Sequence, residues 1–330
     1  MNRHLIILPI FLSLCLAGVC QDKFSAQVVK FNPKLDAIIS ENAEVEVIAE
    51  GFLWCEGPLW LEKEQMLLFS DVPANTIYKW TKQKGKEVYL TPSGYTGTIK
   101  RGGETGSNGL LLNRKGQLIL CQHGDRRIAL MDAPLKQPAP KFITLANLYN
   151  NKKFDSPNDA VVRSNGDIYF TDPPYGLERN VRDTNKAAPY QGVYKVDTKG
   201  KVTLLTDTIT RPNGIAFFPG EKKILIANSD PRKPYWYIYD ISKDRELTNG
   251  RIFYDATNEA KTERGAPDGL KIDKKGNVFA TGPGGVWIFD SNGNVLGKIK
   301  VNDLTSNCAI SKDGTLYITA NRRVLKVKLK

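Results

Sequence analysis

The sequence has few of the residues that build common catalytic and metal sites. It contains only two histidines in 330 residues, His4 and His123, and its five cysteines include no C-x-x-C pair. It also lacks a G-x-S-x-G segment, a phosphate-binding glycine loop and a dinucleotide-binding fingerprint. These absences argue against a Ser-His-Asp triad, a cysteine-rich zinc site and a nucleotide-binding module.

Long blocks of one charge are also absent, although the formal net charge is +12. The lysines occur singly or in pairs in turn-like segments, as at Lys222-Lys223 and Lys274-Lys275, without interleaved aromatic residues. This pattern predicts a solvated basic surface and no nucleic-acid partner. The oligomeric state is left open by the sequence.

The N-terminus carries a short apolar run, Leu5 to Val19, which is typical of a signal-peptide core and too short for a membrane span. We expect a signal peptide at 1–20, an N-terminal extension at 21–44 and one folded domain at 45–330. The mature protein would be exported, periplasmic or secreted, without a transmembrane segment. The alternative is lipid anchoring at Cys20, because Leu16 to Cys20 loosely resembles a lipobox, although Val19 is a poor match.

Three cysteines remain if Cys20 leaves with the signal: Cys55, Cys121 and Cys308. An odd number without paired spacing argues against a disulfide framework. Each lies in or beside a strand-like apolar run. We therefore predict three buried free thiols.

One sequence pattern recurs six times along the chain. A small polar dipeptide opens a short apolar strand, a glycine turn follows seven or eight residues later, and a second strand rich in Ile, Leu, Tyr and Phe comes next. The positions that open the six copies are Glu56, Asn108, Asn158, Asn213, Asp268 and Asn307, at intervals of 52, 50, 55, 55 and 39 residues. Short strands at this period are typical of propeller blades. The sequence predicts an all-β, six-bladed β-propeller with four-stranded blades.

The ends of the repeat predict how the ring closes. Because 323–327 is the last strand-like run, we expect Val45 to Ala49 to pair with it as the outer strand of the last blade. Two connections, 92–106 and 176–191, are longer than hairpins need. Long loops on a rigid scaffold often carry function, so both are candidate walls of a substrate pocket.

The residue that opens each inner strand should lie at one mouth of the central channel. All six are oxygen donors, with no histidine or cysteine among them. Two carboxylates with amides favour a hard cation, Ca²⁺ or Mg²⁺, over zinc. The alternative is that Asn-Gly and Asp-Gly only form turns. A turn needs neither Glu56 in the first copy nor proline before the dipeptide in three others, so we predict a central metal site. His123 is either packed in the core or in contact with a ligand above the channel.

The sequence resembles the family of gluconolactonases, regucalcin (senescence marker protein) and luciferin-regenerating enzymes over roughly 45–330. The resemblance depends on four segments: Glu56-Gly57-Pro58; Ser156 to Asp159 with Phe170 to Gly176; Arg211 to Gly214; and Pro267-Asp268-Gly269. It implies one divalent metal, with Ca²⁺ favoured and Mg²⁺, Mn²⁺ or Zn²⁺ as alternatives. Glu56, Asn213 and Asp268 would hold it, with Asn158 as a further ligand or substrate contact. The animal branch has an arginine where this chain has Ser156, so the substrate can differ.

The resemblance also implies a function, a metal-dependent hydrolase that opens a sugar-derived lactone. In that mechanism the metal polarises the carbonyl, Asp268 orients or deprotonates water, and Asp159 is an alternative base. Glu56 and Asn213 complete the catalytic set, and Asn108, His123, Tyr175, Asp159 and Asn307 would contact the sugar. Two alternatives remain: a phosphotriester hydrolase, and a non-catalytic sugar-binding propeller with structural calcium.

Overall fold

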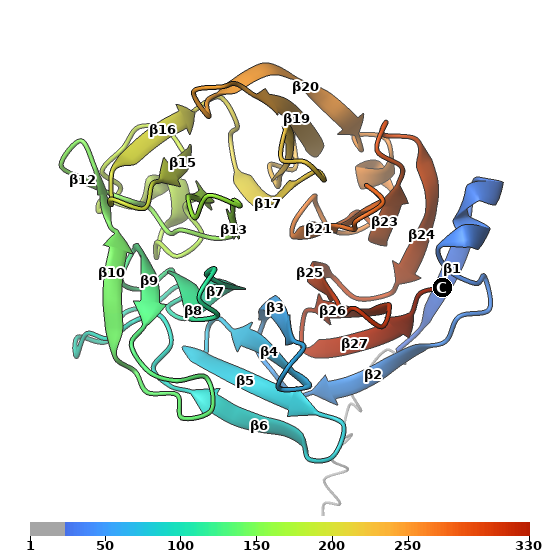
Figure 1. The fold of residues 1–330 in the computed structure, drawn as a ribbon, viewed down its shortest axis with the longest axis horizontal. Helices are drawn as coiled ribbons and strands as arrows, with labels where there is room; N and C mark the ends of the chain where they lie inside the picture. Colours follow the sequence, from blue (N-terminus) through green and yellow to red (C-terminus); the bar gives the residue numbers. More distant parts are fainter. Residues whose placement is uncertain (1–23) are drawn as a thin grey trace, which may run out of the picture.

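The computed structural model describes residues 24–330. The predicted signal peptide, and with it the lipid-anchoring alternative at Cys20, lies outside these residues. Figure 1 shows six sheets arranged as a ring, each with one strand near the centre and one at the rim. This arrangement confirms the predicted six-bladed propeller. Within 24–330, no helix is both long and apolar enough to cross a bilayer.

Each blade is built on four antiparallel strands, and blade five has a fifth. The first blade contains β3 (Cys55–Leu61), β4 (Met66–Asp71), β5 (Thr76–Thr81) and β6 (Gly85–Leu90). The second contains β7 (Ser107–Leu112), β8 (Leu118–Gln122), β9 (Arg127–Met131) and β10 (Phe142–Ala146). The third contains β13 (Ala160–Val162), β14 (Ile168–Asp172), β15 (Gly192–Val196) and β16 (Val202–Thr206). The fourth and fifth are β17 (Pro212–Phe217), β18 (Lys223–Asn228), β19 (Tyr235–Ile241) and β20 (Leu247–Asp255); and β21 (Leu270–Ile272), β22 (Val278–Gly282), β23 (Gly285–Phe289) and β24 (Val295–Val301). The sixth contains β25 (Thr305–Ile310), β26 (Thr315–Ala320) and β27 (Arg323–Lys328).

Short elements occur outside the blades. They are a two-stranded ribbon, β11 (Leu148–Tyr149) with β12 (Lys152–Lys153), and the 3₁₀ helices η1 (Pro33–Ala37), η2 (Asn180–Arg182) and η3 (Glu259–Lys261).

Glycine turns end the inner strands of five blades. The turn glycines Gly116, Gly166, Gly220, Gly276 and Gly314 have φ between 76° and 96°. Only glycine adopts this left-handed region without strain, which explains why the repeat places glycine there. The apolar residues between the turns are buried in clusters shared by adjacent blades, with Trp236, Tyr169 and Phe69 among the largest enclosed side chains.

The ring closes as predicted. Strand β2 (Val45–Glu50) pairs antiparallel with β27, and therefore supplies the outer strand of the last blade. The segment before it adds one feature that the sequence did not predict. Strand β1 (Ala26–Lys30) pairs with β24 as a fifth strand of blade five, and Leu35 of η1 is fully buried against the same blade (Figure 1). Cys55, Cys121 and Cys308 are buried free thiols, as predicted.

Candidate functional site

Neighbouring inner strands approach one another very closely near the propeller axis. A Cβ atom built on Gly57 would lie 2.0 Å from the carbonyl oxygen of Asn108, and one on Gly214 would lie 2.3 Å from that of Asp268. A Cβ on Gly109 would lie 2.7 Å from the carbonyl oxygen of Asn158, and one on Gly269 would lie 2.0 Å from the side chain of Asn307. In these four blades the glycine therefore leaves room for the next blade, and the residue before it is held close to the axis.

Hydroxyl groups join one blade to the next at this level. Ser70 Oγ donates to the Asn108 carbonyl at 3.0 Å, and Thr171 Oγ1 donates to the Asn213 carbonyl at 2.7 Å. Ser306 Oγ donates to the Cys55 carbonyl at 2.6 Å, which links the last blade to the first. Each carbonyl is buried and needs such a donor. These bonds fix where Asn108, Asn213 and Glu56 enter their strands.

Carboxylates at the ends of second strands hold the segments that lead into the inner strands. Asp172 accepts hydrogen bonds from the backbone N–H groups of Asp155 and Ser156 at 2.8 and 2.7 Å. Asp71 accepts in the same way from Leu53 and Trp54. The Phe-Thr-Asp part of the family motif therefore positions the loop that carries Asn158.

The inner-strand residues line a cavity of about 430 Å³ at one mouth of the channel. Six of the predicted site residues lie in its wall: Glu56, Asn108, Asn158, Tyr175, Asn213 and Asp268. The wall also contains residues to which the sequence assigned no role: Trp54, Glu104, Arg211, Ser229, Pro231, Gly265, Ala266, Leu304 and Thr305. The four predicted metal ligands, Glu56, Asn158, Asn213 and Asp268, therefore meet in one cavity.

The two predicted carboxylate ligands are in surroundings that oppose their ionisation when no cation is bound. Glu56 is 2% exposed, and burial raises its pKa to about 8, with further contributions from the charges of Asp159 and Glu104. Burial and then the charge of Glu56 raise the pKa of Asp268 well above its usual range. Within 24–330, no lysine or arginine forms an ion pair with either carboxylate. A bound cation would favour the ionised form of both carboxylates.

Unpaired oxygen atoms give a second test of whether the cavity fits a cation. Asp268 Oδ1 and Asn108 Oδ1 are buried without a hydrogen-bond partner in the described part of the chain. Such atoms are rare and commonly mark a ligand or ion site. The described residues contain no group of three or more His, Cys, Asp or Glu placed to hold a metal, so a cation here would depend on the amide oxygens of Asn158 and Asn213. This donor set fits a hard cation.

Three predicted substrate residues are absent from the cavity wall. His123 is fully buried, with Nδ1 3.2 Å from Glu104 Oε2, so it lies behind a wall residue. Asn307 donates through Nδ2 to Glu56 Oε2 at 3.5 Å and to Asp159 Oδ2 at 3.4 Å. Lys271 Nζ lies 3.2 Å from Asn307 Oδ1 and 3.9 Å from Asp159 Oδ2. Asp159 and Asn307 thus form a buried polar layer next to Glu56.

The two long loops have different roles. The 92–106 loop contributes Glu104 to the wall, as expected. The 176–191 loop contributes no wall residue, because its polar groups are engaged elsewhere. Lys186 forms an ion pair with Asp155, Arg126 donates to the Asn185 carbonyl at 3.0 Å, and Glu178 accepts from Gly102 N at 2.9 Å. This loop supports the site from outside.

A polar group beside the cavity comes from blades three and four. Tyr175 and Ser229 are joined by a hydrogen bond between their hydroxyl groups, and burial raises the pKa of Tyr175 to about 12. Asn213 Nδ2 donates to Ser229 Oγ at 3.3 Å, which turns its Oδ1 away from that contact. Arg211 precedes the Pro-Asn-Gly segment, and that adjacency is the only sequence signal for its place in the wall.

Comparisons with known proteins show the family to which the chain belongs. A family model described as the SMP-30/Gluconolactonase/LRE-like region matches residues 54–322. A gluconolactonase of Zymomonas mobilis is 37% identical over 311 residues, which cover 92% of this chain and 86% of that protein. A pentonolactonase of Haloferax volcanii is 23% identical over 252 residues, covering 74% and 73%. The solved structure of a Xanthomonas campestris gluconolactonase matches with a TM-score of 0.77 at 26% identity, over 92% of this chain and 95% of that one. The chain therefore belongs to the SMP-30/gluconolactonase/LRE-like family.

Proposed function

We propose that this protein is a divalent-metal-dependent hydrolase of sugar-derived lactones. The observation that carries the proposal is the convergence of Glu56, Asn158, Asn213 and Asp268, from four blades, on one cavity in which neither carboxylate has a cationic partner among the described residues. The names of the relatives, gluconolactonase and pentonolactonase, support lactones as the substrate class.

The four converging residues would hold the cation. Their oxygen donors favour Ca²⁺, and Mg²⁺, Mn²⁺ and Zn²⁺ are the alternatives. When bound, the cation would supply Lewis-acid polarisation of the lactone carbonyl and stabilise negative charge on its oxygen.

The remaining wall residues would bind and orient the substrate. Arg211 and Asn108 offer hydrogen-bonding groups that suit ring hydroxyls, and the Tyr175–Ser229 hydroxyl pair offers a further contact. Asp268 has one buried oxygen without a partner and also lines the cavity, so its carboxylate is the group best placed to orient the attacking water. Asp159 is a weaker candidate for the base, because its oxygens contact Ala160 N and Asn307 outside the wall.

The test is hydrolysis of glucono-1,5-lactone and a pentonolactone, measured as acid release above the spontaneous rate. The protein is assayed after chelation and after each cation is restored. We expect activity only with cation, and a loss of about 100-fold or more in Glu56→Gln and Asp268→Asn. Glu246→Gln is a matched control at an exposed position outside the cavity.

Two results would contradict the proposal. Hydrolysis that is unchanged by chelation and by both variants would remove the metal mechanism. Hydrolysis of a phosphotriester but of no lactone would favour the phosphotriesterase alternative, and binding of sugars without any hydrolysis would favour a non-catalytic propeller.

We also propose export to the periplasm or medium, from the apolar run Leu5 to Val19. N-terminal sequencing and mass measurement of the protein from fractionated cells tests this. A chain beginning near Gln21 is expected. A full-length cytoplasmic chain would contradict export, and a lipid mass on Cys20 would show anchoring.

A further inference from the structure

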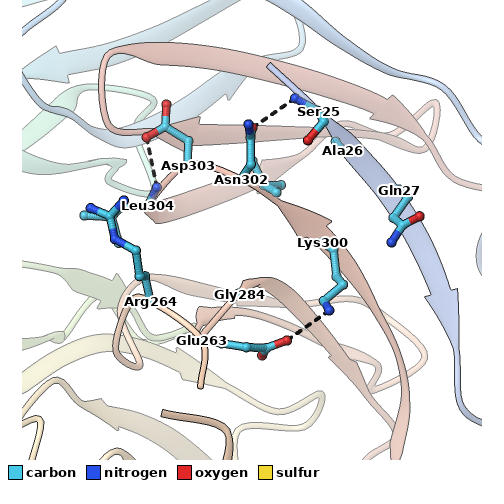
Figure 2. Close-up of a pocket in the computed structure, with 11 residues that line it drawn as sticks. Ser25, Ala26, Gln27, Glu263, Arg264, Gly284, Lys300, Asn302, Asp303 and Leu304 are labelled. Atoms are coloured by element: carbon cyan, nitrogen blue, oxygen red, sulfur yellow. Dashed lines mark hydrogen bonds and ion pairs between the residues drawn. The ribbon is translucent and has the colours of Figure 1, made fainter. Parts of the chain in front are cut away.

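A second cavity, of about 450 Å³, lies between blades five and six and strand β1. Figure 2 shows Glu263, Arg264 and Lys300 around a common space, with Asn302 and Asp303 beyond it and Ser25 to Gln27 on the side of β1. The extension before the propeller thus builds one wall. No role in the lactonase site described above requires this cavity.

The second cavity opens on the same face of the propeller as the candidate active site. Its wall comes from the segments that lead into inner strands β21 and β25 and from the turn between β22 and β23. Leu270 pairs with Ala280, and Gly282 with Gly285, so this turn lies at the end where β21 begins. The inner-strand residues of the candidate active site lie at that same end.

The two cavities are immediate neighbours. Leu304 lines both of them. Arg264 lines the second cavity and the next residue, Gly265, lines the first. A narrow wall of these residues separates the two spaces, so a substrate bound at the candidate metal ligands could extend over Leu304 into the second cavity.

The charges around the second cavity leave one group unpaired. Glu263 pairs with Lys300 at 3.2 Å and also with Lys298. Asp303 pairs with Arg323 at 2.7 Å. Within 24–330, the Arg264 guanidinium forms no hydrogen bond or ion pair, although five N–H donors are available to it. Ser25 and Gln27 add neutral polar side chains.

We propose that this cavity is a subsite for a second sugar unit attached to the lactone, with Arg264 as its main hydrogen-bond donor. A polar space whose Glu263, Lys300 and Asp303 are paired, with the exposed Arg264 guanidinium free, suits a polyhydroxylated group, and its position next to the candidate active site suits one linked to the substrate. The inference depends on the proposed lactone-binding function of the first cavity. It makes the protein selective for lactones of disaccharide acids.

The experiment compares binding of two stable product acids, gluconate and cellobionate, by isothermal titration calorimetry in the presence of Ca²⁺. We expect cellobionate to bind about tenfold more tightly, as one or two added hydrogen bonds to a charged group allow. Arg264→Gln should reduce this advantage to threefold or less, and gluconate affinity should not change. Gln27→Trp, at an exposed position on β1, should do the same by filling the cavity.

Matched controls separate the subsite from general effects. Arg251→Gln removes an exposed arginine from outer strand β20, and Val47→Trp adds an indole on exposed β2. Both should keep the tenfold advantage. Equal binding of the two acids, or an advantage that survives both subsite variants, would overturn the proposal. Failure of the first cavity to hydrolyse glucono-1,5-lactone would instead refute the proposed function, and the binding comparison would still decide whether the subsite exists.

Discussion

Replacing Glu56 with glutamine tests whether the first cavity is built to hold a cation. The Glu56 carboxylate is 2% exposed. In the described residues it accepts hydrogen bonds from Gly57 N at 3.1 Å and Asn307 Nδ2 at 3.5 Å and forms no ion pair. Because burial raises its pKa to about 8, the group is largely protonated at pH 7 when no cation is bound. Glutamine has nearly the same shape and charge as this protonated form.

The magnitude follows from linkage between binding and folding. A cation that binds only the folded state stabilises it by about 2.7 kcal/mol at a concentration one hundred times its Kd. For a chain of this size, that gain raises Tm by about 4 °C. We expect the parent protein to show this rise on addition of calcium. Glu56→Gln should show less than a third of it, because one of two carboxylates is gone.

The metal-free proteins give the complementary result. Without calcium, Glu56→Gln should melt at the same temperature as the parent or above it, because glutamine does not have to take up a proton when the chain folds. Scanning calorimetry at pH 7, with chelator, Ca²⁺ or Mg²⁺, measures both effects, and Glu246→Gln should behave as the parent does. A variant that keeps the full calcium rise, or that melts several degrees below the parent in chelator, would refute the reasoning.

Three further predictions concern the structure around the two cavities. Gly214→Ala places a Cβ 2.3 Å from the Asp268 carbonyl, so it should lower the free energy of unfolding in urea by about 1–3 kcal/mol and weaken calcium binding. Gly116→Ala, at an open turn, should leave calcium binding intact. Thr171→Val removes the hydroxyl that donates to the Asn213 carbonyl at 2.7 Å, and should lower the free energy of unfolding by about 1–3 kcal/mol. Thr203→Val, on outer strand β16, should change it little. Equal costs for the two variants would contradict the role of Thr171. Partial burial opposes ionisation of Glu263, but Lys298 and Lys300 hold its pKa below the ordinary value of 4.5. The stability that the ionised carboxylate adds is therefore fully present above pH 4.5 and is lost as the pH falls through the lowered pKa. Glu263→Gln should therefore cost about 2 kcal/mol at pH 7 and much less near pH 3, and a pH-independent difference would argue against the ion pairs.

The blades were predictable because their signals are local. A glycine at positive φ and a run of alternating apolar residues depend on a few neighbouring residues, so Gly116 or Gly276 marks a turn wherever the chain goes next. The first residues of the inner strands were predictable for a similar reason. Propeller symmetry places equivalent positions around one axis, and Glu56, Asn108 and Asp268 are equivalent by their spacing.

The rest of the site depends on contacts between distant segments. Glu104 reaches the cavity from a long loop whose path is set by tertiary contacts, such as that of Arg101 with the Gly124 carbonyl at 2.9 Å. His123 follows a second strand in the sequence, but the approach of Gly176, whose Cβ would lie 2.7 Å from that of His123, encloses it. Strand β1 joins β24 across more than 260 residues, and no periodic signal in so short a segment predicts its partner.

The repeated dipeptide combines two functions that the sequence could not separate. An Asn-Gly or Asp-Gly pair is typical of a turn, and on that basis the glycine would serve the local backbone. In the structure, Gly109, Gly214 and Gly269 admit the next blade, and their closest contacts are with Asn158, Asp268 and Asn307 of that blade. The first residue of each pair supplies an oxygen near the axis, and the second sets how near the next oxygen can come. A larger residue in place of one of these glycines would push the two blades apart and would increase the distances between the oxygen donors near the axis. In the four blades that carry this glycine, the close packing of the ring and the geometry of the candidate metal site are therefore one constraint, because both depend on the same two residues.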